Sequence, residues 1–100
     1  MSHELKNRLR SDLTSARKDR DKLRTLVLST ILADVHNREI ELRAELSDDQ
    51  TIKVLSRGIK QRKDAASQMR AAGRDELASE EEAQLRLCRR CRLAEVAREE

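Results

Sequence analysis

Helix-breaking residues are almost absent from this chain of 100 residues, in which proline does not occur and glycine occurs only twice. A sheet needs tight turns, and tight turns depend on such residues, so a β-rich fold is excluded. The chain is instead rich in Ala, Leu, Glu, Lys and Arg, which favour helix. The sequence therefore predicts one small all-α domain, an antiparallel helical bundle of about four helices.

The chain contains no aromatic residue. Its core must be built from Leu, Ile, Val, Ala and Met, whose larger side chains contribute about 1.5 to 3 kcal/mol each when buried. Sequence-specific reading of unstacked bases commonly uses aromatic stacking platforms, and this chain has none. We therefore expect modest stability and no base-specific recognition of single strands.

The charges are numerous and mixed, with 22 basic and 19 acidic side chains and a net charge of +3. Such interleaving is typical of solvated helix faces and only weakly indicates a polyanionic partner. No apolar run approaches the roughly 20 residues of a membrane span, and the start MSHELKNRLR lacks the hydrophobic segment of a secretion signal. We expect a cytoplasmic protein that has no membrane contact and keeps its cysteines reduced.

Each expected helix begins near residues that can cap it. The candidates are Ser2 for the first helix, Asp19 or Asp21 for the second, the capping box of Ser47 and Gln50 for the third, and either Asp75 or the box of Ser79 and Glu82 for the fourth. Because no Gly or Pro separates the first two helices, their break could also be a kink. The third helix should close at Gly73, which can adopt the left-handed conformation.

Apolar residues cover well over half of the second helix, roughly residues 21 to 43, so we expect it at the centre of the bundle with neighbours on several sides. Arg24 and Arg38 fall within this apolar sector. Arg62 likewise interrupts the apolar stripe of the third helix. An unpaired guanidinium in a dry core is costly, so we expect these arginines to find carboxylates, with Asp34 and Glu41 as candidates, or to reach the rim. For Arg62, and for Arg24, a structural or partner-contact role is favoured over direct ligand contact.

Two stretches resemble the GatB/YqeY family of small bacterial proteins. They are DKLRTLVLSTILADVHNREIE at 21 to 41, and the run from LSDDQTIKVLSRGIKQRKDA at 46 to 65 to AAGRDELA at 71 to 78 with EEE at 80 to 82. The resemblance covers residues 1 to about 83. After Glu82 the chain reads AQLRLCRRCRLAEVAREE and departs from the family's pattern. We therefore expect a helical N-terminal domain at 1–83, a divergent or truncated helical tail at 84–100, and no second family domain.

The family is similar to the helical tail of the GatB component of the glutamyl-tRNA(Gln) amidotransferase, a module implicated in holding tRNA. The resemblance thus implies association with tRNA or a tRNA-modifying enzyme. It also implies an alternative, carbon–nitrogen ligase activity with glutamine as amide donor.

A basic face on the third helix could track a phosphate backbone, which requires only cations at intervals. The candidate nucleic-acid-binding residues are Lys53, Arg57, Lys60, Lys63 and Arg74. The alternative is an ordinary solvated helix face, whose positive charge is reduced by Asp64.

The sequence contains no recognisable catalytic or metal-binding motif. Cys88 and Cys91 have a two-ligand spacing, but His3 and His36 are both distant in sequence, so we expect no metal site and no cofactor. No nucleophile motif or glycine-rich phosphate loop is present. We therefore expect a non-catalytic accessory module, with a protein–protein adaptor as the other alternative. Self-association is left open.

Overall fold

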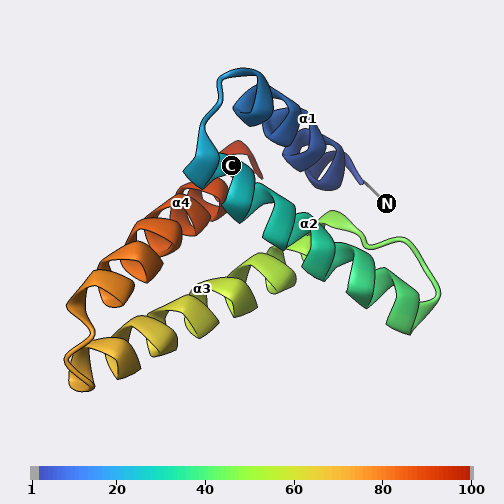
Figure 1. Cartoon of the computed structure of the whole chain (residues 1–100). Coiled ribbons are helices and arrows are strands. Elements are labelled where there is room, and N and C mark those ends of the chain that lie inside the picture. The colour runs from blue at the N-terminus through green and yellow to red at the C-terminus, as the bar shows by residue number, and fades with distance from the viewer. Residues whose placement is uncertain (1–2, 100) are drawn as a thin grey trace. The chain divides into compact units, whose positions relative to one another are not determined.

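The computed structural model describes residues 3–99, and the side chains of residues 3–91. Over this range the chain is all-α, with four helices and no strand, as predicted (Figure 1). It divides into two compact units, Met1–Val54 and Leu55–Glu100, and the division falls inside the third helix. Each unit contains a pair of helices and is described by itself.

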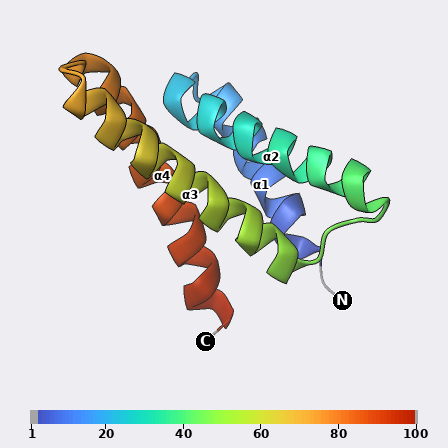
Figure 2. The ribbon, with the colours of Figure 1, turned by 90° about the horizontal axis from the view of Figure 1, so that it is seen from below.

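The first unit pairs α1 (Glu4–Lys18) with α2 (Lys22–Leu42), which lie side by side in Figures 1 and 2. Its core is aliphatic, as the composition predicted, and the buried residues are Leu5, Leu9, Ala16, Val27, Leu28, Ile31, Val35 and Leu46. The N-cap residue of α1 is His3, whose side chain makes no capping hydrogen bond. The predicted cap Ser2 lies outside the described residues.

A true break, not a kink, separates α1 from α2. Arg20 has a left-handed backbone with φ of 55°. Asp21 then caps α2, because its side chain accepts a hydrogen bond of 3.1 Å from the backbone N–H of Arg24. The sequence offered Asp19 or Asp21 for this role, and the structure selects Asp21.

The surface of α2 corrects one prediction. Broad coverage of this helix was expected, but several of its large apolar side chains are exposed: Leu23, Leu26, Ile40 and Leu42, with exposed fractions of 38%, 50%, 62% and 41%. The buried side chains follow the narrower stripe of Val27, Leu28, Ile31 and Val35. The helix α2 therefore carries more large apolar side chains than its packing against α1 buries.

A buried lysine links the start of α1 to the end of α2 and to the loop that follows α2. The Lys6 side chain is only 4% exposed, and its Nζ donates to Glu39 Oε2 at 2.9 Å and to Glu45 Oε1 at 2.7 Å. Burial lowers the pKa of the Lys6 ammonium, but the hydrogen bonds to the two carboxylates outweigh burial and hold that pKa above its ordinary value. Lys6 therefore remains charged inside the unit.

The carboxylates of this network also hold the connection from α2 to α3 (Asp48–Ala71). Glu39 Oε2 accepts a further hydrogen bond, 2.9 Å, from the backbone N–H of Leu46. Asp48 Oδ1 accepts one of 3.0 Å from the N–H of Leu5, a donor that the first turn of α1 leaves without a helical partner. Polar bonds thus join α1 to the start of α3.

The predicted capping box opens α3. Gln50 N–H donates to Ser47 Oγ at 3.3 Å, and Ser47 N–H donates to Gln50 Oε1 at 3.0 Å. At the other end Gly73 has φ of 74°, and Arg74 N–H donates to the Met69 carbonyl at 2.8 Å. This is the glycine-closed helix end that the sequence indicated.

The second unit pairs α3, from Leu55 onward, with α4 (Asp75–Glu99). The fourth helix therefore starts at Asp75 and not at the alternative box of Ser79 and Glu82. Its partner α3 buries Leu55, Ile59 and Ala66. These are three members of the expected apolar stripe, whereas Ile52 and Met69, its other two members, are only half-buried. From α4, Ala78, Leu85 and Cys88 complete the buried apolar side chains among the described residues of this unit.

We expect Lys6→Met to destabilise the first unit by about 3 kcal/mol, because the substitution leaves the Glu39 carboxylate, 15% exposed, without its buried counter-ion. Urea unfolding followed by circular dichroism measures the loss. Glu45→Gln is the control: Glu45 is 58% exposed, so the effect should be much smaller. Equal losses in the two variants would contradict the assigned role of burial.

The same network predicts a loss of stability in acid. The Lys6 hydrogen bond holds the pKa of the Glu39 and Glu45 carboxyls below its ordinary value, and for Glu39 the Leu46 N–H adds to this effect. Their contribution is present above the unfolded pKa of about 4.3 and is lost as pH falls through the lower folded pKa. Urea unfolding at pH 6 and pH 3 should show a larger fall for the natural chain than for Lys6→Met. Identical falls would argue against the network as the source.

Candidate nucleic-acid interface

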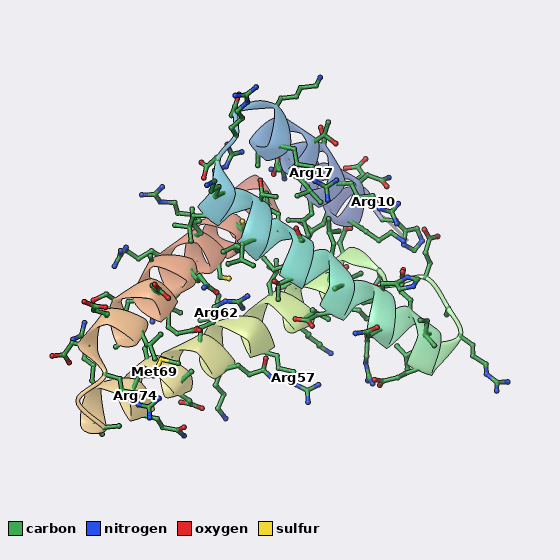
Figure 3. The ribbon with its side chains drawn as sticks, in the orientation of Figure 1. Arg10, Arg17, Arg57, Arg62, Met69 and Arg74 are labelled. Carbon is green, nitrogen blue, oxygen red and sulfur yellow. The ribbon has the colours of Figure 1, made fainter. Side chains whose placement is uncertain are left out.

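Three of the predicted nucleic-acid-binding residues lie on α3 within the second unit. Arg57, Lys60 and Lys63 are all exposed, and Figure 3 shows Arg57 extending away from the ribbon. Their spacing of three residues places successive cations about 4.5 Å apart along the helix axis. We call these three residues the basic ridge.

The basic ridge is not neutralised by ion pairs. Among the described residues, no carboxylate lies within 4.0 Å of a ridge cation, and the nearby Asp64 is exposed. Arg70, on the same helix, behaves differently: it contacts Asp75 at 3.4 Å and forms a close pair with Glu82. The ridge therefore presents cations to solvent, whereas Arg70 is used to link α3 with α4.

The other two predicted residues are also exposed but lie elsewhere. Lys53 belongs to the first unit, so it is not assigned to the same surface as the ridge. Arg74 follows Gly73 in the connection between α3 and α4, beyond the end of the ridge helix (Figure 3). The structure thus brings together Arg57, Lys60 and Lys63 from the predicted set of five.

Arg62 is buried, with 8% of its surface exposed, and it points from α3 toward α4 (Figure 3). Its Nε donates to Gln84 Oε1 at 3.4 Å, and its Nη1 donates to the Gly58 carbonyl at 3.3 Å. Both acceptors are neutral. The expectation of a carboxylate partner is therefore wrong within the part of the chain whose side chains are described, and the rim alternative does not apply to a side chain so buried.

Gly58 explains how α3 accommodates this guanidinium. A Cβ at position 58 would stand 3.1 Å from Arg62 Nη1, a tight approach. A glycine inside a helix costs about 0.5 to 1 kcal/mol relative to alanine, so its occurrence one turn before Arg62 has a packing reason. The spacing G-x-x-x-R was the sequence signal for this contact, and it was missed.

The arginines of α2 are paired at the surface. Arg38 Nη1 lies 2.9 Å from Glu41 Oε2, which confirms one proposed partner. Arg24 Nη1 lies 3.6 Å from Asp19 Oδ2 and 4.0 Å from Asp21 Oδ2, so the residues preceding the helix supply its carboxylates, and Asp34 does not. A helical wheel of α2 alone could not show this pairing across the turn.

Cys88 is buried and Cys91 is half-buried on α4, and neither forms a disulfide. Within the described residues, no group of three or more His, Cys, Asp or Glu side chains is arranged to hold a metal ion. Nor does any helix among these residues combine the length and hydrophobicity needed to cross a membrane.

Lys6 is the structural residue that sequence reasoning missed. It adjoins Leu5 on the buried side of α1. Its position next to the Leu5 and Leu9 stripe was a weak signal. Because a charged residue at the margin of an apolar stripe is usually solvated, only the carboxylates of α2 and the following loop reveal its burial.

These features define a small all-α protein whose helix pairs bury aliphatic stripes and leave a basic ridge exposed. The chain matches the family described as YqeY-like protein over residues 6–99. It belongs to that family, as its resemblance indicated. Comparison with the curated proteins finds no match. The division at residue 83 and the absence of a second family domain stay predictions, although the matched residues continue through most of the tail.

We expect Arg62→Met to leave the free energy of unfolding unchanged or to raise it by about 1 kcal/mol, because a buried charge with neutral acceptors is replaced by an apolar side chain of similar length. Gln84 is only half-buried and can turn to water. Urea unfolding provides the test, and a loss above about 2 kcal/mol would show that the guanidinium stabilises the helix pair.

Proposed function

We propose that this protein is a non-catalytic accessory helical module that associates with tRNA, alone or together with a tRNA-dependent amidotransferase. The observation that carries the proposal is the basic ridge: three exposed cations in seven residues of one helix, with no ion pair to a described carboxylate. Family membership supports it through the family's similarity to the helical tail of the GatB component of the amidotransferase.

The ridge suits backbone contact better than base reading. Phosphate contacts need cations at intervals and carry no sequence information, and both features match a lysine- and arginine-bearing helix face. The chain has no aromatic side chain on which bases could stack. The proposed association is therefore salt-sensitive and tolerant of RNA sequence.

The adaptor alternative is favoured by a different observation. Leu23 and Leu26 near the start of α2, and Ile40 and Leu42 near its end, are exposed apolar side chains. Exposed apolar side chains suit contact with a protein partner, and such binding would depend little on salt. The two functions therefore separate by their ionic-strength dependence. The ligase alternative stays a prediction of the resemblance.

We expect Arg57→Gln, Lys60→Gln and Lys63→Gln combined to weaken binding to bulk tRNA about ten-fold or more at low salt and to reduce the salt slope of the affinity by about 3, because each phosphate contact contributes about one unit of slope. Filter binding or fluorescence anisotropy between 20 and about 200 mM salt measures both quantities.

The matched control combines Lys18→Gln, Arg38→Gln and Arg43→Gln, three exposed residues of the first unit. It removes the same net charge, so it should weaken binding far less if the ridge is the contact. Equal weakening by both triple variants would show non-specific attraction by net charge. Absence of tRNA binding by the natural chain at low salt would discard the proposal in favour of the adaptor.

A further inference from the structure

One flank of the α3 and α4 pair is marked by a contact between the two helices. Arg70 of α3 forms a close pair with Glu82 of α4, and its guanidinium also approaches Ser79 Oγ at 3.5 Å. Gln84 follows Glu82 by two residues, which is about 200° around a helix, so the contact of Arg62 with Gln84 marks the other flank. Both contacts lie within the second unit.

Helical periodicity extends the Arg70 flank away from the turn between the two helices. Positions seven residues apart lie on the same face of a helix, about two turns from each other. On α3 the residue seven positions before Arg70 is Lys63, and on α4 the residue seven positions after Glu82 is Arg89. The pair of opposite charges is thus followed, two turns further on, by two cations.

A third cation, Arg86, follows Glu82 by four residues and therefore shares its face of α4. The hydrogen bond from Arg70 is the main cause that holds the pKa of the Glu82 carboxyl below its ordinary value, and the charge of Arg86 lowers that pKa further. This effect agrees with a position of Arg86 on the same flank.

A fourth cation, Lys60, precedes Lys63 by three residues on α3. All four side chains are exposed, and among the residues whose side chains are described none of the four forms an ion pair. We call Lys60, Lys63, Arg86 and Arg89 the basic flank. Two of its members belong to the basic ridge of α3, and the other two bring α4 into the same surface.

This arrangement of like charges is unfavourable unless an anion lies between them. The carboxylates of α4 that precede Arg86 lie toward the turn, and Glu82 is already paired with Arg70. On α3, Asp64 is exposed and lies about 100° around the helix from Lys63. Cations that face one another across two packed helices repel, and a bound polyanion would relieve that repulsion.

We propose that the basic flank binds a double-helical stem of RNA, to which α3 and α4 each contribute one row of cations. The inference rests on the proposed tRNA association and adds Arg86 and Arg89 to it. The axes of packed helices stand about 8 to 10 Å apart, so the two rows are separate. A double helix presents the phosphates of two strands in a fixed array that two rows can contact together, and arginine forms paired hydrogen bonds with phosphate oxygens.

A single strand fits this surface less well. Proteins that bind single strands without sequence preference stack the bases on aromatic side chains, and this chain has no aromatic residue. Double-stranded RNA is instead recognised mainly by its shape and its backbone, for which exposed cations are sufficient. The basic flank therefore favours the stems of a folded RNA.

The test compares two double variants of the full chain. Arg86→Gln with Arg89→Gln removes the α4 row, and Arg74→Gln with Arg90→Gln is the matched control. All four arginines are exposed and belong to the second unit, so the two variants lose the same charge. Arg74 lies in the connection before α4, and Arg90 is about 200° around α4 from the buried Cys88, on the side away from α3.

Binding is measured by fluorescence anisotropy with an RNA duplex of about 16 base pairs as probe. We expect the α4-row variant to weaken binding about five-fold or more at low salt and to lower the salt slope by about 2, and the control to weaken binding less than about two-fold. Circular dichroism should show unchanged helicity and an unfolding temperature equal to or higher than that of the natural chain, because the variant removes repulsion.

Equal weakening by the two double variants would overturn the proposal. Binding of a single strand of the same length as tightly as the duplex, or of a DNA duplex as tightly as the RNA duplex, would also overturn it. If the natural chain binds tRNA and only the ridge variant weakens that binding, this inference fails and the proposed function stands. If the natural chain binds neither tRNA nor the duplex at low salt, both fail.

Discussion

The buried ammonium of Lys6 is the interaction on which the first unit depends. It lies at one end of the α1 and α2 pair and joins Glu39 of α2 to Glu45 of the following loop. Glu39 in turn accepts the Leu46 N–H, and Leu46 itself is fully buried. A cation in this position satisfies two carboxylates, and those carboxylates orient the loop that starts α3. The aliphatic stripes supply the attraction between the helices, but apolar packing tolerates more than one alignment of two helices. Paired charges favour a single alignment.

The second unit buries a cation by different means. Arg62 lies between α3 and α4 with neutral acceptors, the Gln84 amide and the Gly58 carbonyl. Guanidinium is more weakly hydrated than ammonium and presents five donors, so it tolerates burial among neutral oxygens better than lysine would. The glycine beneath it provides the room. Each unit thus buries the cation that suits its acceptors. Lys6 is buried between two carboxylates, and Arg62 is buried against two neutral amide oxygens.

The exposed cations differ in whether they form ion pairs with carboxylates. Arg24, Arg38 and Arg70 are engaged with carboxylates of the same unit and contribute to local structure. The basic ridge has no such pairs within the described residues. A net charge of only +3 conceals this division, because the acidic side chains are distributed unevenly among the cations. The proposed tRNA contact rests on where that unevenness leaves positive charge exposed.

The sequence by itself determined the all-α class, the ends of α3 and the buried side of α3, because capping, glycine closure and apolar spacing act over a few residues. Ser47 with Gln50 and the turn at Gly73 could be predicted for that reason. The family also followed from local motifs. Only the tertiary structure decided the pairings between segments far apart along the chain, such as Lys6 with Glu39 and Arg62 with Gln84. It also decided that Leu26 and Ile40 are exposed and lie outside the core. A helical wheel shows which side a residue occupies, but the partner on that side depends on how two helices pack, and that packing is a property of the folded chain.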